Sequence, residues 1–432
     1  MRTLSLCLIV LVGLIAALAP AAAGPAAAPP SVAIENVKLA GPHLLQIDIA
    51  AQGFDGQASG ASQGTGAPAV TLSVWLDGVP TLAAMPLIHM PPRFAMVFDL
   101  AAGVVSVGGI SVGAFHPIPP FAENMRFPIE VTIQHGPRTA RAQREAAILL
   151  PTVVVPGYLD EIMGPDSDML AAFRRHGYTD TGPSPSVFGF QYSSQVSLEA
   201  GAQSLASYVR QTVLPATYAA KINVVGFSAG GLMARWNIEN NTDGWGSLVN
   251  RLVLVGVPNE GVVLAYVGEH APSFFPFAGV GKSPIAHSVL PTFPFWHDDP
   301  GQAWTVPPDS GNPFLARLNA QPIPPAVRVY LFYGSHDPRN TAGPKTAAGI
   351  TGRLPGAVLS YGPGDGIVLA ASAQGLPING GPGVAGLADR AVLRVDLGSV
   401  YHLSLLGAGA DRIAGALLDR FSSTVDEGAA RQ

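Results

Sequence analysis

The hydrophobic pattern of the chain changes its period near residue 146. Before that point, apolar and polar residues alternate in short segments that Gly- and Pro-rich stretches separate. The alternating segments are 45–49, 70–76, 94–100 and 129–133. A period of two predicts half-buried strands, and no helical pattern interrupts them. We therefore expect a small, all-β, sandwich-like domain over residues 31–144.

Beyond residue 146, near-continuous apolar runs alternate with segments of helical period. The run 148–155 is typical of a strand that is buried on both faces of a parallel sheet. Further runs of this kind are 186–191, 222–225, 252–255, 327–333 and 391–395, and the helical segments are 169–176, 198–213 and 408–421. The alternation predicts an α/β domain over 146–424, with a mostly parallel sheet and helices on both faces.

One segment, at about 261–325, breaks this alternation. It is rich in proline and in large apolar side chains, including Phe274, Phe277, Trp296 and Trp304. Because an ordinary surface loop is polar, we expect the segment to form a cap over a functional site. Simple packing against the sheet or against the N-terminal domain is the alternative.

The pentapeptide G-x-S-x-G occurs three times, around Ser62, Ser111 and Ser228. Only Ser228 has a strand-like run before it and a helix-compatible run after it. A serine on a sharp strand-to-helix turn presents its hydroxyl above the edge of the sheet, as the nucleophile of acyl-transfer enzymes does. Ser228 is therefore the predicted nucleophile, and an exposed turn serine is the alternative.

A serine nucleophile requires a histidine base and a carboxylate, which follow it along the chain in this fold. His402 lies in a short segment between the last predicted strand and the last predicted helix, where the base is expected. Two carboxylates are candidates for the acid. Asp337 directly follows a strand, and Asp365 lies in a tight turn between Gly364 and Gly366. The spacing alone slightly favours Asp337.

The oxyanion of the reaction intermediate requires two backbone N–H donors. One is expected from Ala229, which follows the nucleophile. The other is expected from Tyr158, because Gly157 lets the loop after the first strand of the α/β domain turn close to the site. A plain Pro-Gly turn at Pro156-Gly157 is the alternative.

The composition narrows the setting of this chemistry. Residues 1–23 have a positive start, an apolar core and a small-residue end, as expected of a cleaved secretory signal rather than of an uncleaved membrane anchor. The single cysteine, Cys7, lies within that segment, so the mature protein is expected to have no disulfide. A net charge of −5 with 12% charged residues argues against a nucleic-acid partner. No later segment is long and apolar enough for a membrane span.

At these residues the chain resembles the lipase branch of the α/β-hydrolase superfamily, in the style of secreted bacterial lipases and lecithin:cholesterol-acyltransferase-type lipases. The matching segments are 155–158, 226–235, 257–261, 312–319, 364–368 and 402–403. In such lipases the acid resembles the aspartate of the Gly-Asp-Gly turn, so the resemblance moves the choice to Asp365. The chain departs from the common pattern at Pro156, where many members have histidine, and at Phe227. The calcium-binding aspartates of some bacterial lipases have no clear counterpart, so we expect no metal and no cofactor.

Together these features predict a secreted hydrolase of carboxylic esters with apolar acyl chains, a lipase or esterase whose substrate includes esters at a lipid interface. A polyester depolymerase, a thioesterase or an acyltransferase would use the same three residues. A non-catalytic surface-binding protein on a hydrolase scaffold is the alternative of another class.

Overall fold

The structure is a computed structural model that describes part of the chain. The described residues are 29–52, 54, 70–76, 79–86, 92–115, 117–135, 138–157, 167–193, 196–261, 313–336, 364–365, 368–376, 383–387 and 392–418. They belong to two compact units, of which one consists of the chain up to Leu149 with Ala216–Tyr218, and the other of Leu150–Pro215 and the chain from Ala219 onward.

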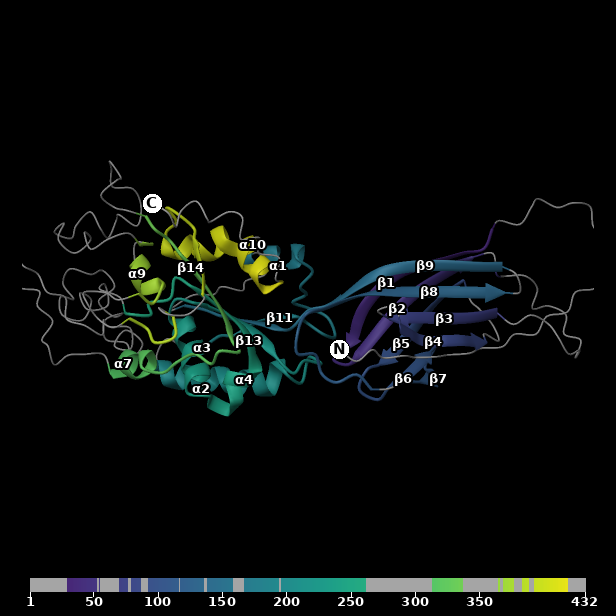
Figure 1. Ribbon diagram of the computed structural model, residues 1–432, viewed down its shortest axis with the longest axis horizontal. Coiled ribbons are helices and arrows are strands. Elements are labelled where there is room, and N and C mark those ends of the chain that lie inside the picture. The colour runs from purple at the N-terminus through teal and green to yellow at the C-terminus, as the bar shows by residue number, and fades with distance from the viewer. Residues whose placement is uncertain are drawn as a thin grey trace, which may run out of the picture. The chain divides into compact units, whose positions relative to one another are not determined.

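The first unit contains two antiparallel sheets. One has the strand order β1-β2-β5-β6-β7, and the other has the order β4-β3-β8-β9, whose strands lie side by side in Figure 1. The strands are β1 (Ser31–Gly41), β2 (Leu44–Gln52), β3 (Val70–Leu76), β4 (Val79–Pro86), β5 (Arg93–Asp99), β6 (Val104–Val107), β7 (Ile110–Ala114), β8 (Met125–His135) and β9 (Arg138–Ile148).

Alternating side chains of these strands form the core of the first unit. The buried apolar residues on β2, β5 and β8 are Leu45, Ile47, Ile49, Ala51, Met96, Phe98, Ile129, Val131 and Ile133. The predicted period of two is therefore confirmed for these strands. The edge strands β1 and β9 of the two sheets are joined by Arg144, whose guanidinium donates to the carbonyl of Ile34 at 3.1 Å.

The second unit is built on a parallel six-stranded sheet with the order β11-β10-β12-β13-β14-β15. Its elements are β10 (Thr152–Val155), α1 (Asp168–Arg175), β11 (Val187–Gly189), α2 (Leu198–Tyr208), η1 (Val209–Val213), β12 (Ile222–Phe227), α3 (Ala229–Glu239), η2 (Thr242–Gly244), α4 (Trp245–Leu248), β13 (Val249–Val255), α7 (Pro313–Asn319), β14 (Arg328–Tyr333), α9 (Ala370–Ala373), β15 (Leu393–Asp396), η6 (His402–Ser404) and α10 (Leu405–Leu417). Because the strands are parallel, their carboxyl ends meet at one edge of the sheet, where such folds place their sites.

Helices cover both faces of this sheet. In Figure 1, α1 and α10 lie on one side of the strands, and α2, α3 and α4 lie on the other. All residues of the central strands β12 and β13 are buried. The predicted α/β fold class is confirmed, because a parallel sheet with helices on both faces is accompanied by an antiparallel β region.

The sequence predicted one strand over the apolar run 148–155, but the structure divides this run between two strands. Ile148 ends β9 in the antiparallel sheet, and Thr152 begins β10 in the parallel sheet. Between them, the ring of Pro151 fixes the backbone φ and removes an N–H donor, so the chain can leave one ladder and enter the other. Hydrophobicity is equally high on both sides of this point and therefore gives no sign of the change of sheet.

Two helices also differ from their predicted bounds. The segment 198–213 is an α-helix only as far as Tyr208 and continues as a π-helical turn. The last helix begins at Leu405, closer to His402 than the sequence indicated. Within the described ranges, no helix has the length and apolar character that crossing a bilayer requires.

The packing of α2 against α3 generates a stability prediction. A Cβ atom on Gly201 would lie 2.6 Å from Cε of Met233, whereas a Cβ on Gly415 of α10 would meet no atom within 4 Å. We expect Gly201→Val to lower the free energy of unfolding by about 1–3 kcal/mol, because the branched side chain overpacks the contact. The matched variant Gly415→Val should not lower it. Urea unfolding followed by tryptophan fluorescence measures both, and equal losses would contradict this account of the packing.

Candidate active site

Ser228 lies on the turn between β12 and α3, with a strained backbone. Its φ of 49° and ψ of −125° place it outside the conformations that residues with a Cβ atom ordinarily adopt. The Ser228 N–H donates to the carbonyl of Val255 at the end of β13, at 3.0 Å, and this bond holds the turn against the neighbouring strand. The observed geometry is that of a nucleophile elbow.

Steric contacts explain why glycine occupies the positions two residues before and two residues after Ser228. A Cβ on Gly226 would lie 2.4 Å from Cα of Gly231, so the strand could not pass the start of the helix. A Cβ on Gly230 would lie 2.2 Å from the carbonyl oxygen of Pro156. The second contact also shows that the loop after β10 lies directly against the first turn of α3.

Asp365 and His402 form a buried pair. The side chains are 2.8 Å apart between Oδ2 of Asp365 and Nδ1 of His402, and the residues are only 1% and 4% exposed. Because a carboxylate only accepts, Nδ1 carries the proton, which leaves Nε2 of the neutral ring as the acceptor. That is the tautomer a general base needs.

Backbone contacts fix the orientation of both members of this pair. Oδ1 of Asp365 accepts from the N–H of Val368 at 2.7 Å, so both carboxylate oxygens are engaged. The N–H of His402 donates to the carbonyl of Asp365 at 2.9 Å. The pair is therefore joined twice, once through the side chains and once through the backbone.

The pair is enclosed by residues at the carboxyl ends of the central strands. A Cβ on Gly256, which follows β13 with a φ of 55°, would lie 3.1 Å from both Oδ2 of Asp365 and Cε1 of His402. The ring of Phe227, the residue before Ser228, packs against the His402 ring with centroids 4.8 Å apart. The segment that carries the serine thus contacts the histidine directly.

The structure brings some of the predicted residues together and leaves others outside the described residues. Asp365 and His402 are bonded, and Ala229 is the first residue of α3, where helix N–H groups have no partner within the helix. Between the described Ser228 and His402, no hydrogen bond joins the hydroxyl to the ring. Tyr158 and Asp337 lie outside the described residues, as do residues 262–312 of the predicted cap.

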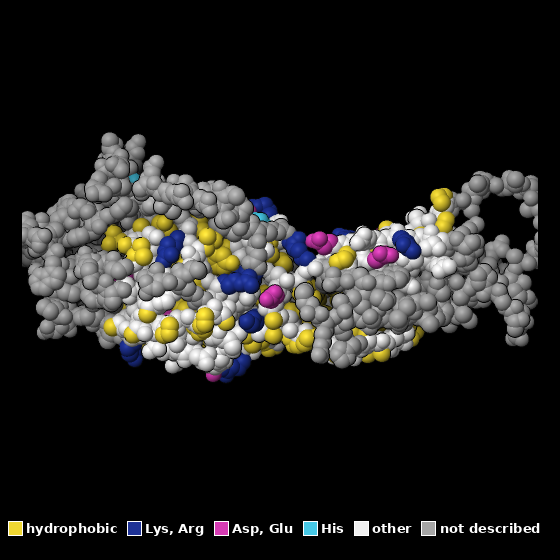
Figure 2. All heavy atoms as spheres, viewed as in Figure 1, with side chains coloured by type: hydrophobic (Ala, Val, Ile, Leu, Met, Phe, Trp, Pro, Cys, Tyr) yellow, Lys and Arg dark blue, Asp and Glu magenta, His cyan; other side chains and the backbone are white. Residues whose placement is uncertain are grey.

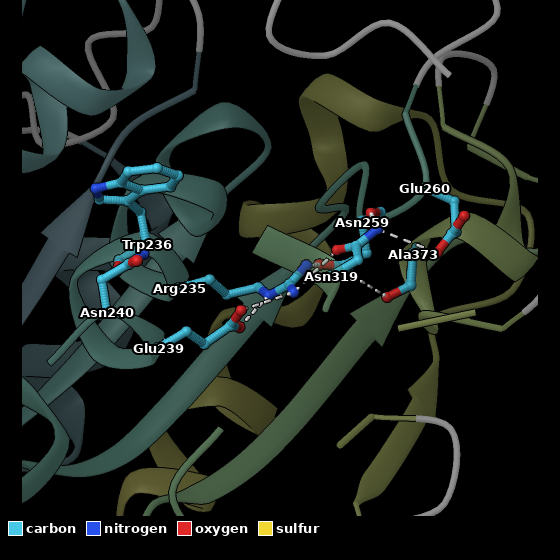
Figure 3. A network of polar contacts seen from close by, with 8 residues as sticks. All are labelled: Arg235, Trp236, Glu239, Asn240, Asn259, Glu260, Asn319 and Ala373. Atoms are coloured by element: carbon cyan, nitrogen blue, oxygen red, sulfur yellow. Dashed lines mark hydrogen bonds and ion pairs between the residues drawn. The ribbon is translucent and has the colours of Figure 1, made fainter. Parts of the chain in front are cut away.

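A buried polar network that the sequence did not predict is centred on Arg235 and Glu239 in the second half of α3 (Figure 3). Arg235 of α3 is fully buried and forms a bidentate ion pair with Glu239, at 2.7 and 3.2 Å. Its guanidinium also donates to the side-chain oxygens of Asn259 and Asn319, at 2.9 and 3.0 Å. A sequence signal was present, since a charged pair spaced i,i+4 in an otherwise apolar helix indicates a paired, buried interaction.

This network connects α3 to three other segments. Asn259, in the loop after β13, donates to the carbonyl of Ala373 in α9 at 2.9 Å. Asn319, at the end of α7, donates to the carbonyl of Asn259 and to the carboxylate of Glu260, at 2.8 and 3.1 Å. Because α9 follows the turn that carries Asp365, the helix that starts at Ser228 and the segment of the acid are bonded to one frame.

Burial changes the acidity of Glu239. Removal from water raises the pKa of Glu239 to about 7, and the adjacent Arg235 opposes this rise without cancelling it. In the described part of the chain, no group of three or more His, Cys, Asp or Glu side chains could hold a metal ion.

The acidity of Glu239 predicts a pH dependence of stability. Between its ordinary value of 4.5 and about pH 7, the carboxyl of Glu239 binds a proton more often in the folded state than in the unfolded chain, because its pKa is higher in the folded state. The folded state then binds more protons, so the free energy of unfolding should fall as the pH rises through this range, by up to about 3 kcal/mol.

Glu239→Gln should lack this fall, because glutamine does not titrate. Urea unfolding of both proteins between pH 4.5 and pH 8 measures their free energies of unfolding. The value for the original protein minus the value for Glu239→Gln should decrease as the pH rises. A difference that is constant or increases over this range would contradict the raised pKa.

No protein-family model and no curated protein matches this chain. Among solved structures it is similar to the mature lipase BlEst2 of Bacillus licheniformis, with 16% identity, a TM-score of 0.43, and coverage of 62% of this chain and 91% of that one. The metagenomic carboxyl esterase MGS0156 shares 17% identity at a TM-score of 0.39, over 63% of this chain and 76% of its own. Lipase 1 from Pelosinus fermentans shares 14% identity at a TM-score of 0.35, over 62% and 98%. Similarity at this level carries no information on activity.

Proposed function

We propose that this chain is a secreted serine hydrolase that cleaves carboxylic esters of apolar acyl chains. Ser228 is the nucleophile, His402 is the general base and acid, and Asp365 orients the histidine. The observation that supports this assignment most is the buried hydrogen bond between Asp365 and His402, beside the strained turn of Ser228. Secretion rests on the sequence of residues 1–23.

The reaction proceeds in two acyl transfers. Oγ of Ser228 attacks the ester carbonyl carbon while Nε2 of His402 accepts the hydroxyl proton, and Asp365 stabilises the resulting imidazolium. The intermediate collapses, the C–O bond to the alcohol breaks, and His402 returns the proton to the departing oxygen. Water then attacks the acyl-enzyme with His402 as base, and the acid leaves as the Ser228 hydroxyl is restored.

The negative oxygen of each tetrahedral intermediate needs donors that are in place beforehand. The Ala229 N–H, at the start of α3, is one of them. The Tyr158 N–H is the other in this proposal, because the preceding loop at Pro156 lies within contact of Gly230. The proposed steps use side chains and backbone groups of the chain and require no cofactor or metal.

Apolar side chains flank the proposed base and support an apolar substrate. Leu403 is 72% exposed and Tyr401 is 36% exposed, although His402 between them is buried. On the face shown in Figure 2, the charged side chains of the described residues are scattered among apolar and neutral ones. Such a surface favours a neutral acyl chain, including one presented at a lipid interface, over a charged substrate.

A fluorophosphonate probe tests the nucleophile. We expect the probe to modify Ser228, because its phosphorus reacts with an activated serine hydroxyl. Ser228→Ala should abolish labelling and lower the hydrolysis of nitrophenyl esters by about 10⁴-fold or more. Ser111→Ala is the matched control, since Ser111 occupies the same pentapeptide in the antiparallel strand β7 and should be dispensable.

The same assay tests the substrate class. Esters of long acyl chains should be cleaved at least as well as acetyl and butyryl esters. Labelling that persists in Ser228→Ala would overturn the proposed nucleophile. A preference confined to short chains would overturn the proposed acyl group but leave the nucleophile in place.

The identity of the acid can be tested by two asparagine substitutions. Asp365→Asn should lower kcat by about 10⁴-fold, because an amide donates to Nδ1 and stabilises the wrong tautomer of His402. Asp337→Asn should leave kcat within a factor of about ten, since the neighbouring His336 contacts Tyr401 and Gly364 rather than the base. The reverse ranking of the two variants, measured at saturating ester, would reassign the acid to Asp337.

A further inference from the structure

The side chain of Tyr192 ties the loop after β10 to the segment after β11. The hydroxyl of Tyr192 donates to the carbonyl of Gly157 at 2.9 Å. Gly157 is separated from Tyr192 by 35 positions along the chain, so the bond is a tertiary contact and not part of a local turn. The proposed oxyanion donor is the N–H of the residue that follows Gly157.

The geometry of a peptide unit gives this bond a consequence. In a trans peptide, the carbonyl of one residue and the N–H of the next point in opposite directions. A bond that holds the Gly157 carbonyl on one side therefore directs the other half of the same peptide unit to the opposite side. Without the bond, the peptide can rotate and present its carbonyl oxygen to the site, where it would repel an oxyanion.

The order of the strands shows which side of this peptide faces β11 and which faces β12. In the sheet, β10 lies between β11 and β12, with Val154 paired to Gly189 on one side and Val155 paired to Gly226 on the other. Tyr192 follows β11, and Ser228 follows β12. The Gly157 carbonyl is thus held toward β11, and the opposite direction is toward the strand that carries the nucleophile.

Tyr192 is itself held in place by the sheet. Its ring stacks on Phe190 with centroids 6.1 Å apart and an interplanar angle of 19°. Phe190 is buried, and its N–H donates to the carbonyl of Val154 at 2.9 Å, which continues the ladder between β11 and β10. The stacking on Phe190 therefore fixes the position from which the Tyr192 hydroxyl donates to the loop.

We propose that Tyr192 is a positioning residue of the oxyanion site, which it orients through the carbonyl of Gly157. The inference rests on the proposed function, because it requires that the peptide after Gly157 stabilise a tetrahedral intermediate. Tyr192 does not touch the substrate in this assignment. Its effect is on the transition state, and it should not alter the binding of the ester in its ground state.

Tyr192→Phe tests this role, because it keeps the stacked ring and removes only the hydroxyl. We expect kcat for a nitrophenyl ester to fall by about tenfold to a hundredfold, with KM within about twofold of the original value. The affinity for an alkylboronic acid, which forms a tetrahedral adduct with an active serine, should fall by a similar factor.

Tyr208→Phe is a matched control. Tyr208 also contacts the Phe190 ring, at 5.4 Å between centroids, and its hydroxyl also donates to a glycine carbonyl, that of Gly189, at 3.1 Å. In the described part of the loop after β10, at Pro156 and Gly157, Tyr208 has no hydrogen-bond partner. We expect kcat and boronate affinity of Tyr208→Phe to remain within about twofold of the original protein, and the midpoints of thermal unfolding of the two variants to agree.

The outcomes separate this inference from the proposed function. If Ser228→Ala abolishes hydrolysis and Tyr192→Phe matches Tyr208→Phe in kcat, the positioning role is overturned and the hydrolase assignment stands. A loss of kcat in Tyr192→Phe without a loss of boronate affinity also overturns it. If Ser228→Ala retains full hydrolysis, the proposed function itself fails.

Discussion

The turn between β12 and α3 is packed so closely that no side chain fits at Gly226, Gly230 or Gly231. The atoms that a Cβ would meet there belong to the turn itself, to the carbonyls of Val155 and Pro156, and to the side chains of Leu254 and Val257. Three segments of the sheet therefore converge on the start of one helix. Because these surroundings determine the backbone around Ser228, the strained φ of this residue persists. The proposed donor Ala229 and the proposed base His402 both lie beside this turn.

The polar network around Arg235 and Glu239 costs desolvation free energy and has a structural consequence. Burying Arg235 and Glu239 requires their removal from water, which an apolar pair in the same helix would avoid. The network binds α3 to the loop after β13, and that loop to α7 and α9. Because hydrogen bonds are directional, they fix the relative positions of these segments more narrowly than apolar contacts would. The Asp365 turn lies just before α9. The network and the glycine contacts thus act at opposite ends of the same helix.

Much of the arrangement could be predicted from the sequence, because the informative signals are local. The strand, turn and helix around Ser228, the Gly-flanked Asp365 and the position of His402 before the last helix are all visible in short stretches. The proximity of Asp365 to His402 was expected from resemblance, and spacing alone had favoured Asp337.

The remaining features depend on distant partners. The apolar run 148–155 carries no mark of the change of sheet at Pro151. In β9, small alanines take part of the buried face and charged residues lie between them, so the alternation is weak. The bonds of Tyr192 to Gly157 and of Arg235 to Asn319 join positions that only the folded chain brings together.

The central claim is that an alcohol, an imidazole and a carboxylate act on one carbonyl group at the edge of the parallel sheet. A crystal structure of the protein after reaction with an alkylphosphonate tests it most directly, because the adduct resembles the tetrahedral intermediate. The account predicts phosphorus bonded to Oγ of Ser228, Nε2 of His402 within hydrogen-bonding distance of that oxygen, and the phosphoryl oxygen facing the N–H groups of Ala229 and Tyr158. An adduct on another residue, or a His402 ring that remains out of reach of Ser228, would contradict it.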